Sequence, residues 1–296
     1  MPFASRASRD PRRATLWVGL ALVAVFWPLN WWPGLESTHL LFFPLWLGYV
    51  LAVDGVVLRR TGNSLLWRSP SVFLALFPLS VPTWWLFEAF NERLGNWEYV
   101  GAERFSDLEY FLYASLSFST VIPAVFESAE LVRSFKFIER FSAGPRFPRG
   151  GDSTAYRFTL ALLGAAMLAA TLLWPRYCYP FVWTSLVFLF EPLCLALGRR
   201  GFTHDFARGD WRPWMSLWIG GLLCGFFWEL WNVHSDPKWI YHVPFVGFWK
   251  LFEMPILGYL GYLPFAMELY LVARLVLPRD ARAPFSQAVA DRPLAA

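Results

Sequence analysis

The sequence predicts an all-α membrane protein, a bundle of eight transmembrane helices arranged as two four-helix repeats of the same orientation. Hydrophobic residues make up 56% of the chain and charged residues only 16%, whereas an ordinary soluble domain carries about 25% charged residues. Several apolar runs reach the roughly 20 residues that a helix needs to cross the hydrocarbon layer of a bilayer. The expected membrane spans are 15–32, 39–59, 70–91, 107–132, 156–174, 180–197, 212–233 and 248–275.

Basic residues predict how these helices are oriented. Lys and Arg concentrate in the cytoplasmic loops of membrane proteins, and here they gather after the second, fourth, sixth and eighth spans. These residues are Arg59, Arg60, Arg68, Arg133, Lys136, Arg140, Arg146, Arg149, Arg199, Arg200, Arg208, Arg274, Arg279 and Arg282. Both termini are therefore expected on the cytoplasmic side of a plasma (inner) membrane. The first apolar run ends in Trp31-Trp32 rather than in small residues, so we expect an uncleaved helix and not a signal peptide.

The two halves of the chain carry the same marked residues in the same order. In each half a Glu and an Asn lie three positions apart, followed by a Trp-x-Tyr motif, a second Glu, and a Pro with a third Glu four positions later. The members are Glu88, Asn91, Trp97, Tyr99, Glu109, Pro123 and Glu127 in the first half, and Glu229, Asn232, Trp239, Tyr241, Glu253, Pro264 and Glu268 in the second. Four spans in each half give both halves the same orientation, which makes this a parallel repeat.

The predicted domain organisation follows from the repeat and the basic loops. It consists of a basic cytoplasmic N-terminus (1–14), a first four-helix repeat (15–133), a basic cytoplasmic linker (134–155), a second four-helix repeat (156–277) and a disordered cytoplasmic tail (278–296).

Acidic residues within the spans are the strongest indication of a functional site. A charged residue at the centre of a transmembrane helix costs about 2.5–3.5 kcal/mol on insertion scales, so such residues normally face the interior of the bundle. We expect the carboxylates near the outer ends to converge on one site as catalytic acids and bases: Glu88, Glu109, Glu229 and Glu253. A second, inner layer is expected to have a structural or proton-handling role: Asp54, Glu127, Glu191 and Glu268. The simpler interpretation, in which a Glu–Asn pair only hydrogen-bonds to a neighbouring helix, stays open.

Aromatic residues supply the second functional indication. The chain holds 18 Trp, 29 Phe and 11 Tyr, and an aromatic face attracts a cation. Carboxylic acids among aromatic faces fit a reaction in which the acid protonates an alkene and the aromatic walls stabilise the resulting carbocation. The candidates for binding a lipophilic substrate are Trp85, Asn91, Trp97, Tyr99, Trp228, Asn232, Trp239 and Tyr241.

Metal and cofactor chemistry has little support in the sequence. The Cys and His residues show no CxxC, H-x-x-H or H-x-x-x-H spacing, which argues against the membrane di-iron hydroxylases and desaturases, since these need many imidazole ligands. We therefore expect no metal and no cofactor. The basic residues lie in short loops and do not indicate a nucleic-acid partner, so the expected partners are a lipophilic small molecule and membrane lipid.

The repeated motif resembles the signature of the membrane-embedded lycopene cyclase domain family of carotenoid biosynthesis. That signature has an acid with an Asn, a Trp-x-Tyr some nine residues on, and an acidic pair followed by Phe, and the last part reads Leu108-Glu109-Tyr110-Phe111 here. The resemblance implies two related domains and a cofactor-independent, proton-initiated ring closure of a long polyene within the bilayer. This chain departs from the signature in that the acid and the Asn are three apart instead of adjacent, and the acidic pair is reduced to one Glu.

The leading hypothesis is a membrane enzyme that modifies an isoprenoid or carotenoid-like lipid. It would be either a cyclase or a hydratase that adds water to the same cation. One alternative is a proton-coupled transporter or carrier that uses the intramembrane carboxylates, and another is a non-catalytic membrane assembly subunit. The sequence leaves the substrate, the product and the oligomeric state open.

Overall fold

The computed structural model describes residues 14–35, 37–147 and 153–277, and this part of the chain is almost entirely helical. Its α-helices are α1 (Ala14–Asn30), α2 (Phe42–Thr61), α3 (Leu65–Arg68), α4 (Pro70–Leu94), α5 (Asp107–Phe118), α6 (Val121–Arg133), α7 (Thr154–Leu173), α8 (Pro175–Cys178), α9 (Val182–Ala196), α10 (Phe202–Arg208), α11 (Arg212–Asn232) and α12 (Tyr262–Val276). The 3-10 helices are η2 (Ala102–Arg104), η3 (Lys136–Phe141), η4 (Tyr179–Phe181) and η5 (Ile256–Gly261). The strands are β1 (Trp97–Val100), β2 (Lys238–Tyr241), β3 (Lys250–Leu251) and β4 (Met254–Pro255). The expected basic N-terminus up to residue 13 and the expected tail from 278 lie outside the described residues.

Six helical segments are long and apolar enough to cross a membrane. They are Phe42–Thr61, Pro70–Leu94, Asp107–Arg133, Thr154–Leu173, Pro175–Ala196 and Ile256–Val276. α1 is apolar but shorter, with 17 residues. α11 has 21 residues and falls outside this group, because Glu229, Asn232 and several Gly residues reduce its apolar character. The described part of the chain therefore has the helices of an integral membrane protein.

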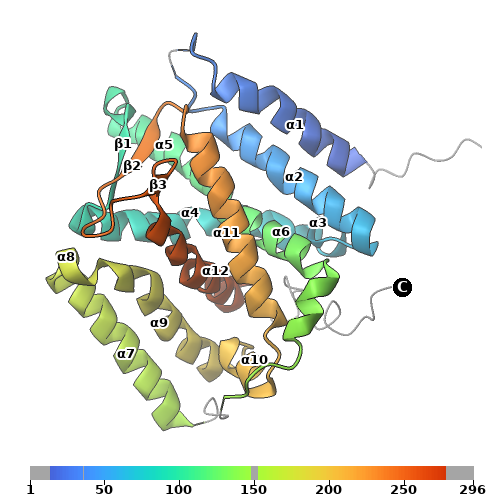
Figure 1. Ribbon diagram of the computed structural model, residues 1–296, viewed down its shortest axis with the longest axis vertical. Coiled ribbons are helices and arrows are strands. Elements are labelled where there is room, and N and C mark those ends of the chain that lie inside the picture. The colour runs from blue at the N-terminus through green and yellow to red at the C-terminus, as the bar shows by residue number, and fades with distance from the viewer. Residues whose placement is uncertain (1–13, 36, 148–152, 278–296) are drawn as a thin grey trace, which may run out of the picture.

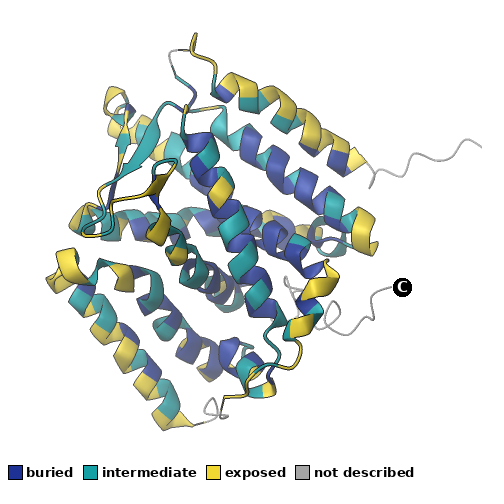
Figure 2. Ribbon diagram, in the orientation of Figure 1, coloured by how far each residue is buried: buried dark blue, intermediate teal, exposed yellow. Residues whose placement is uncertain are grey.

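The long helices form a bundle around α11, which runs through the middle of the molecule (Figure 1). α11 packs against α6 and α12, and both α2 and α4 pack against α6. α1 lies along α2 at one edge, and α7 lies along α9 at the opposite edge. Much of the surface of α1 and α7 is exposed, whereas α6 and much of α11 are buried (Figure 2). Two helix hairpins therefore form the periphery, where a membrane protein meets lipid.

Glycines allow some of these helices to approach closely. A Cβ atom on Gly19 of α1 would overlap the backbone of Ala52 in α2. A Cβ atom on Gly220 of α11 would lie 2.5 Å from the backbone nitrogen of Ala129 in α6. Small residues at such contacts are typical of transmembrane helices, because close van der Waals packing drives their association in lipid.

Strands β1 and β2 connect the first half of the chain to the second. They pair antiparallel, with Trp97 opposite Tyr241 and Tyr99 opposite Trp239. β1 follows α4 directly and β2 follows α11 after a short loop, so the sheet lies beyond the ends of these two helices (Figure 1). The two Trp-x-Tyr motifs, far apart in sequence, therefore form one small sheet.

Two of the expected spans differ from the structure. The run 107–132 is divided between α5 and α6, and the backbone N–H of Ile122 at the break donates to the hydroxyl of Ser80 in α4 at 2.8 Å. The run 248–275 is helical only from η5 onward, because β3 and β4 before it pair into an antiparallel hairpin. The predicted span 107–132 therefore corresponds to one apolar segment, Asp107–Arg133, with a short break inside it. In the run 248–275 the prediction of a helix was wrong for the residues before Ile256.

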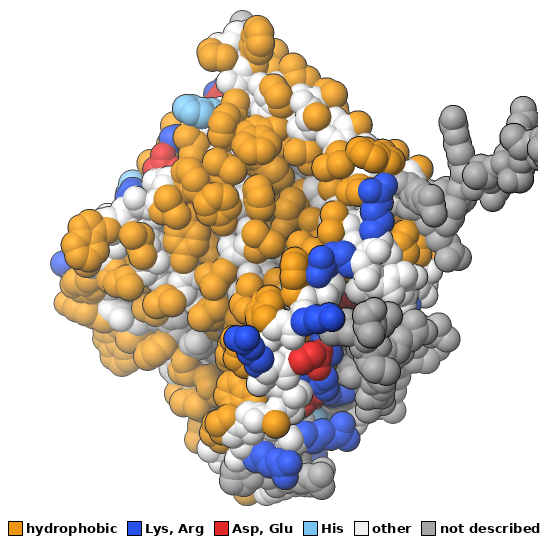
Figure 3. All heavy atoms as spheres, turned by 45° about the vertical axis from the view of Figure 1, so that its right-hand side comes forward, with side chains coloured by type: hydrophobic (Ala, Val, Ile, Leu, Met, Phe, Trp, Pro, Cys, Tyr) orange, Lys and Arg blue, Asp and Glu red, His pale blue; other side chains and the backbone are white. Residues whose placement is uncertain are grey.

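The surface separates apolar from basic regions. Hydrophobic side chains cover most of the face seen in Figure 3, and Lys and Arg side chains gather toward one end of it. Near the chain segment that links the halves, Glu139 of η3 accepts from Arg133 of α6 at 2.5 Å and from Arg212 of α11 at 2.8 Å. Apolar sides with basic ends are the pattern of a protein that lies in lipid and meets water at its loops.

Candidate functional site

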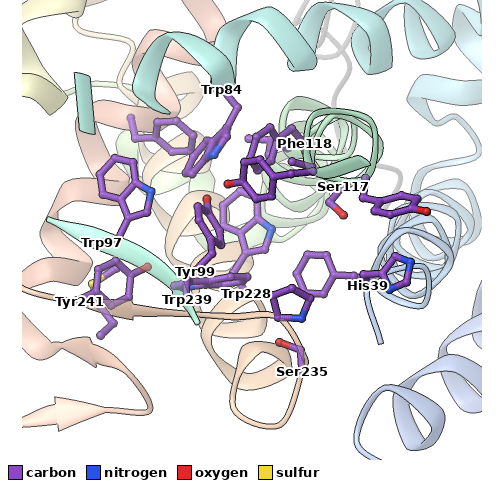
Figure 4. A pocket seen from close by; sticks show the side chains of 18 of the residues that line it. His39, Trp84, Trp97, Tyr99, Ser117, Phe118, Trp228, Ser235, Trp239 and Tyr241 are labelled. Carbon is purple, nitrogen blue, oxygen red and sulfur yellow. The ribbon is translucent and has the colours of Figure 1, made fainter. Parts of the chain in front are cut away.

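A cavity with a volume of about 170 Å³ lies beside the β1–β2 pair and is lined by both halves of the chain. Its walls are mostly aromatic and include Trp84, Trp97, Tyr99, Trp228, Trp239 and Tyr241 (Figure 4). The polar side chains of His39 and Ser117 also line it, on the side away from Trp97 in Figure 4. An apolar chamber with a few convergent polar groups is typical of a site for a lipophilic small molecule.

Glu88, near the end of α4, lies behind the aromatic wall. Its Oε1 atom accepts hydrogen bonds from the Tyr99 hydroxyl at 2.6 Å, from Trp84 Nε1 at 2.7 Å and from Trp97 Nε1 at 3.2 Å. All three donors line the cavity, whereas Glu88 does not. The carboxyl therefore reaches the cavity only through the side chains that it holds in place.

Glu229, near the end of α11, has a matching arrangement and is fully buried. Its Oε1 atom accepts from the Tyr241 hydroxyl at 2.7 Å, from the Tyr262 hydroxyl at 3.1 Å and from Trp239 Nε1 at 3.3 Å. Its Oε2 atom has no hydrogen-bond partner among the described residues. A neutral carboxylic acid fits this pattern, with Oε1 as the accepting carbonyl oxygen and Oε2 as the oxygen that carries the proton.

The third donor to the carboxyl comes from a different place in each half. In α4, Trp84 lies four positions before Glu88 and therefore shares its helix face. The corresponding position in α11 is Gly225, four positions before Glu229. Tyr262 of α12 occupies the space that this glycine leaves, and a Cβ atom on Gly225 would overlap the Tyr262 ring. No signal in the sequence marks Tyr262, because its role depends on how α12 packs against α11.

Replacing Gly225 by Ala is expected to displace the Tyr262 ring and break its hydrogen bond to Glu229. Overpacking of this kind typically costs about 1–3 kcal/mol of folding stability, which thermal unfolding in detergent measures. Gly221→Ala on the same helix is the matched control, because its added Cβ would lie 3.1 Å from the nearest atom. Equal unfolding temperatures for the two variants would contradict this account of Tyr262.

Asn91 and Asn232 hydrogen-bond to the strands. The Asn232 amide donates to the backbone carbonyl of Trp239 at 2.7 Å, and its Oδ1 accepts from the Trp239 N–H at 2.9 Å. Asn91 makes the same pair of bonds with the backbone of Trp97, at 2.7 and 3.2 Å. Neither Asn lines the cavity. Each amide therefore holds the backbone of a cavity-lining Trp in place.

Tyr99 and Tyr241 lie between the carboxyls and the cavity. Burial, with the neighbouring carboxyl adding to it, raises the pKa of each phenol well above its ordinary value. Both phenols are therefore protonated at neutral pH. A phenol held 2.6–2.7 Å from a carboxyl oxygen has the geometry for proton transfer between the two groups.

Glu109 and Glu253 make no hydrogen bond to a residue that lines the cavity, so the structure does not join all four outer carboxylates in one hydrogen-bonded site. Glu109 is exposed at the start of α5, where it forms a reciprocal capping box with Ser106. Glu253 accepts from Lys238 Nζ at 2.6 Å in an ion pair. Both side chains have local partners near the ends of secondary-structure elements, and neither lines the cavity.

The two remaining aromatic candidates have different positions. Trp228 lines the cavity, whereas Trp85 does not. Trp85 stacks on Phe111 and donates from Nε1 to the Ser115 hydroxyl at 2.9 Å. Its role is to join α4 to α5.

The inner carboxylates divide into two kinds. Asp54 accepts from the Leu66 N–H at 2.9 Å, and Glu191 accepts from the Thr203 N–H at 2.9 Å. These bonds hold the first turns of α3 and α10, which is a capping role. All four carboxylates are fully buried, but both carboxyl oxygens of Glu127 in α6 and of Glu268 in α12 have no hydrogen-bond partner among the described residues.

Several cavity residues were not among the sequence candidates. They are Thr38, His39, Phe42, Trp84, Phe105, Tyr110, Tyr113, Ala114, Ser117, Phe118, Val121, Trp183, Ser235, Pro237, Met254, Gly258, Gly261, Tyr262 and Phe265. The position of Trp84 four residues before Glu88 on one helix was a usable signal. The others come from loops and helices whose contact with the motif is set by the tertiary fold.

The fold and the cavity define an integral membrane protein with an aromatic chamber backed by two carboxyls, the half-buried Glu88 and the fully buried Glu229. No protein-family model, curated protein or solved structure matches the chain. Within the described residues, no group of three or more His, Cys, Asp or Glu is arranged to hold a metal ion. The functional argument therefore depends on the site itself.

Proposed function

We propose that the protein is an integral membrane enzyme that protonates a carbon–carbon double bond of a long isoprenoid or carotenoid-like lipid, with cyclisation or hydration as the outcome. One observation carries the proposal: Glu88 and Glu229 each hydrogen-bond to a tyrosine that lines the same aromatic cavity. An apolar aromatic chamber suits a polyene. The resemblance of the repeated motif to the lycopene cyclase domain family supports the same class of substrate.

The proton reaches the substrate through a relay. Before the transfer the carboxyl turns so that its protonated oxygen faces the phenol oxygen, and the phenol O–H, which now donates to Oε1 of Glu229, turns toward the alkene. The carboxyl then gives its proton to the phenol oxygen while the phenol gives its own proton to one carbon of the alkene. A C–H bond forms, the π bond breaks, and the adjacent carbon becomes a cation. Aromatic faces such as those of Trp84, Trp97 and Trp239 stabilise a desolvated cation by about 2 kcal/mol or more.

The two carboxyls are suited to different roles. Glu229 has an unpartnered Oε2 atom, as expected for the acid that starts the reaction. Both carboxyl oxygens of Glu88 accept from the indole N–H of Trp97, with distances of 3.2 and 3.3 Å from Nε1. Because an indole N–H only donates, this arrangement favours a carboxylate that later accepts a proton. Paired carboxyls in unlike surroundings are a common basis for acid and base roles.

We also propose that α1 and α11 complete a set of eight transmembrane helices, with both termini on the cytoplasmic side of the plasma membrane and with two halves that arose by duplication. The order of two long helices, a short helix, a long helix and a strand occurs as α1, α2, α3, α4 and β1. It occurs again as α7, α9, α10, α11 and β2, with the short elements α8 and η4 between α7 and α9. Asp54 and Glu191 stabilise the matching short helices. In this orientation the cavity lies at the outer end, away from the basic loops.

The test is expression of the full chain in a bacterial host that accumulates lycopene, with pigments analysed by chromatography and mass spectrometry. A new polyene, isomeric with lycopene or heavier by one water, that is absent from an E88Q/E229Q double variant supports the proposal. Unchanged lycopene, with the protein confirmed in the membrane, overturns it for this substrate. A proton flux across liposomes that contain the purified protein would then favour the carrier, and its absence would favour the assembly subunit.

A further inference from the structure

The cavity has a second polar wall, on α5, that the carboxyls do not use. Tyr110, Tyr113 and Ser117 lie on one face of this helix, at spacings of three and four residues, and all three line the cavity. Their side-chain hydroxyls make no hydrogen bond to any other described residue. Polar groups that face an apolar chamber are costly unless something bonds to them. This row is therefore explained by an occupant that contains oxygen.

His39 extends the polar wall and presents an accepting nitrogen. Its ring packs against the Tyr113 ring with the centroids 4.4 Å apart. Its Nδ1 atom is 2.8 Å from the Ser37 hydroxyl, and that hydroxyl donates its one proton to the backbone carbonyl of Asp236 at 3.0 Å. The Ser37 oxygen must then accept from His39, so Nδ1 carries the ring proton. In the neutral ring Nε2 is consequently an acceptor.

The charges around His39 favour the neutral ring. Burial and then the Arg104 guanidinium lower the pKa of His39. Asp236 and Glu109 act in the opposite direction without reversing the shift. The ordinary pKa of His is about 6.5, so at neutral pH the Nε2 lone pair is available to accept a proton.

We propose that His39, Tyr113 and Ser117 hold a water molecule that adds to the carbocation, which makes the enzyme a hydratase. The inference rests on the proposed function, because it requires the cation. The water oxygen forms a C–O bond to the cationic carbon while His39 Nε2 takes one of the water protons. The substrate thus gains one H from the Glu229 relay and one OH from water, and exchange with solvent restores both protein groups.

The composition of this wall distinguishes hydration from cyclisation. A cyclase must keep water away from its cation until a second double bond has attacked. The wall on α12 can exclude water, because the apolar ring of Phe265 lines the cavity there. The wall on α5 cannot exclude water, because it presents three unbonded hydroxyls beside a histidine. The two walls together fit a cation formed against aromatic faces and captured from the polar side.

The experiment is conversion of lycopene by membranes that contain the full chain, in water enriched in heavy oxygen, with the product analysed by mass. We expect an alcohol that contains heavy oxygen. His39→Phe keeps the ring but removes the base, and we expect at least about a tenfold loss of alcohol, in line with the contribution of a general base. The cation should then lose a proton instead, so an isomer of lycopene should replace the alcohol. Ser117→Ala should shift the product ratio in the same direction by a smaller factor.

Ser115→Ala is the matched control. It removes a hydroxyl from the same helix, but this hydroxyl accepts from Trp85 and does not line the cavity, so the alcohol yield should stay at the wild-type level. A wild-type product that is an isomer without heavy oxygen overturns the water site and leaves the acid-initiated reaction intact. Wild-type alcohol yield in both the His39 and Ser117 variants also overturns it. No conversion at all, with the protein confirmed in the membrane, overturns the proposed function for this substrate together with this inference.

Discussion

Glu229→Gln is expected to abolish conversion of the polyene without unfolding the protein. The Gln carbonyl can accept the three hydrogen bonds now made to Oε1 by Trp239, Tyr241 and Tyr262. Its amide nitrogen takes the place of Oε2, which has no partner among the described residues. The structure is therefore preserved while the transferable proton is lost. Removal of a general acid typically lowers the rate by about 10²–10⁴-fold.

The measurement is product formed per amount of protein in the membrane, together with the unfolding temperature in detergent. Glu109→Gln is the control, because Glu109 is an exposed helix cap and its loss should leave conversion near the wild-type level. Glu88→Gln should reduce conversion less than Glu229→Gln, because Glu88 is not the acid that starts the reaction. A Glu229→Gln variant that converts substrate at the wild-type rate would exclude Glu229 as the acid.

Asn232→Ala is expected to cause the largest loss of folding stability among single changes at this site. Asn232 is fully buried and satisfies both the N–H and the carbonyl of Trp239. Its removal leaves two backbone groups without these partners, and each unsatisfied buried group costs about 1–3 kcal/mol. We therefore expect a loss of about 2–6 kcal/mol, with a lower yield of folded protein.

Asn91→Ala provides an internal comparison for this prediction. Asn91 makes the corresponding bonds to Trp97 but is partly exposed, so water can replace some of what is lost. Its unfolding temperature in detergent should fall less than that of Asn232→Ala. The reverse order, or an Asn232→Ala variant as stable as wild type, would show that the strand does not depend on this amide.

The part of the site built from short-range spacing was predictable from the sequence. Glu88 and Tyr99 lie eleven positions apart, at the end of one helix and in the strand that follows. Glu88 and Glu229 each hydrogen-bond to a tyrosine that lines the same cavity. Tyr262 and His39 were not predictable, because they reach the site from other elements through packing.

The position of Glu109 in the sequence fits two interpretations, a member of an acidic site and a helix cap. Its place in the repeated order suggested a shared acidic site. The local pattern Ser106-x-x-Glu109 before an apolar run is also a capping box, and the structure forms that box. In a membrane helix that starts at the water interface, the first turn needs partners for its free N–H groups, and this local requirement decided the position of the side chain.

The pairing of β1 with β2 is symmetric: the Trp of each Trp-x-Tyr motif lies opposite the Tyr of the other, Trp97 opposite Tyr241 and Trp239 opposite Tyr99. A strand with this property pairs equally well with a second copy of itself about a twofold axis. Under the proposed duplication, an ancestral single unit closed the chamber as a homodimer with two identical carboxyls. The two sides are then free to differ within one chain, as they do where Trp84 in α4 corresponds to Gly225 in α11.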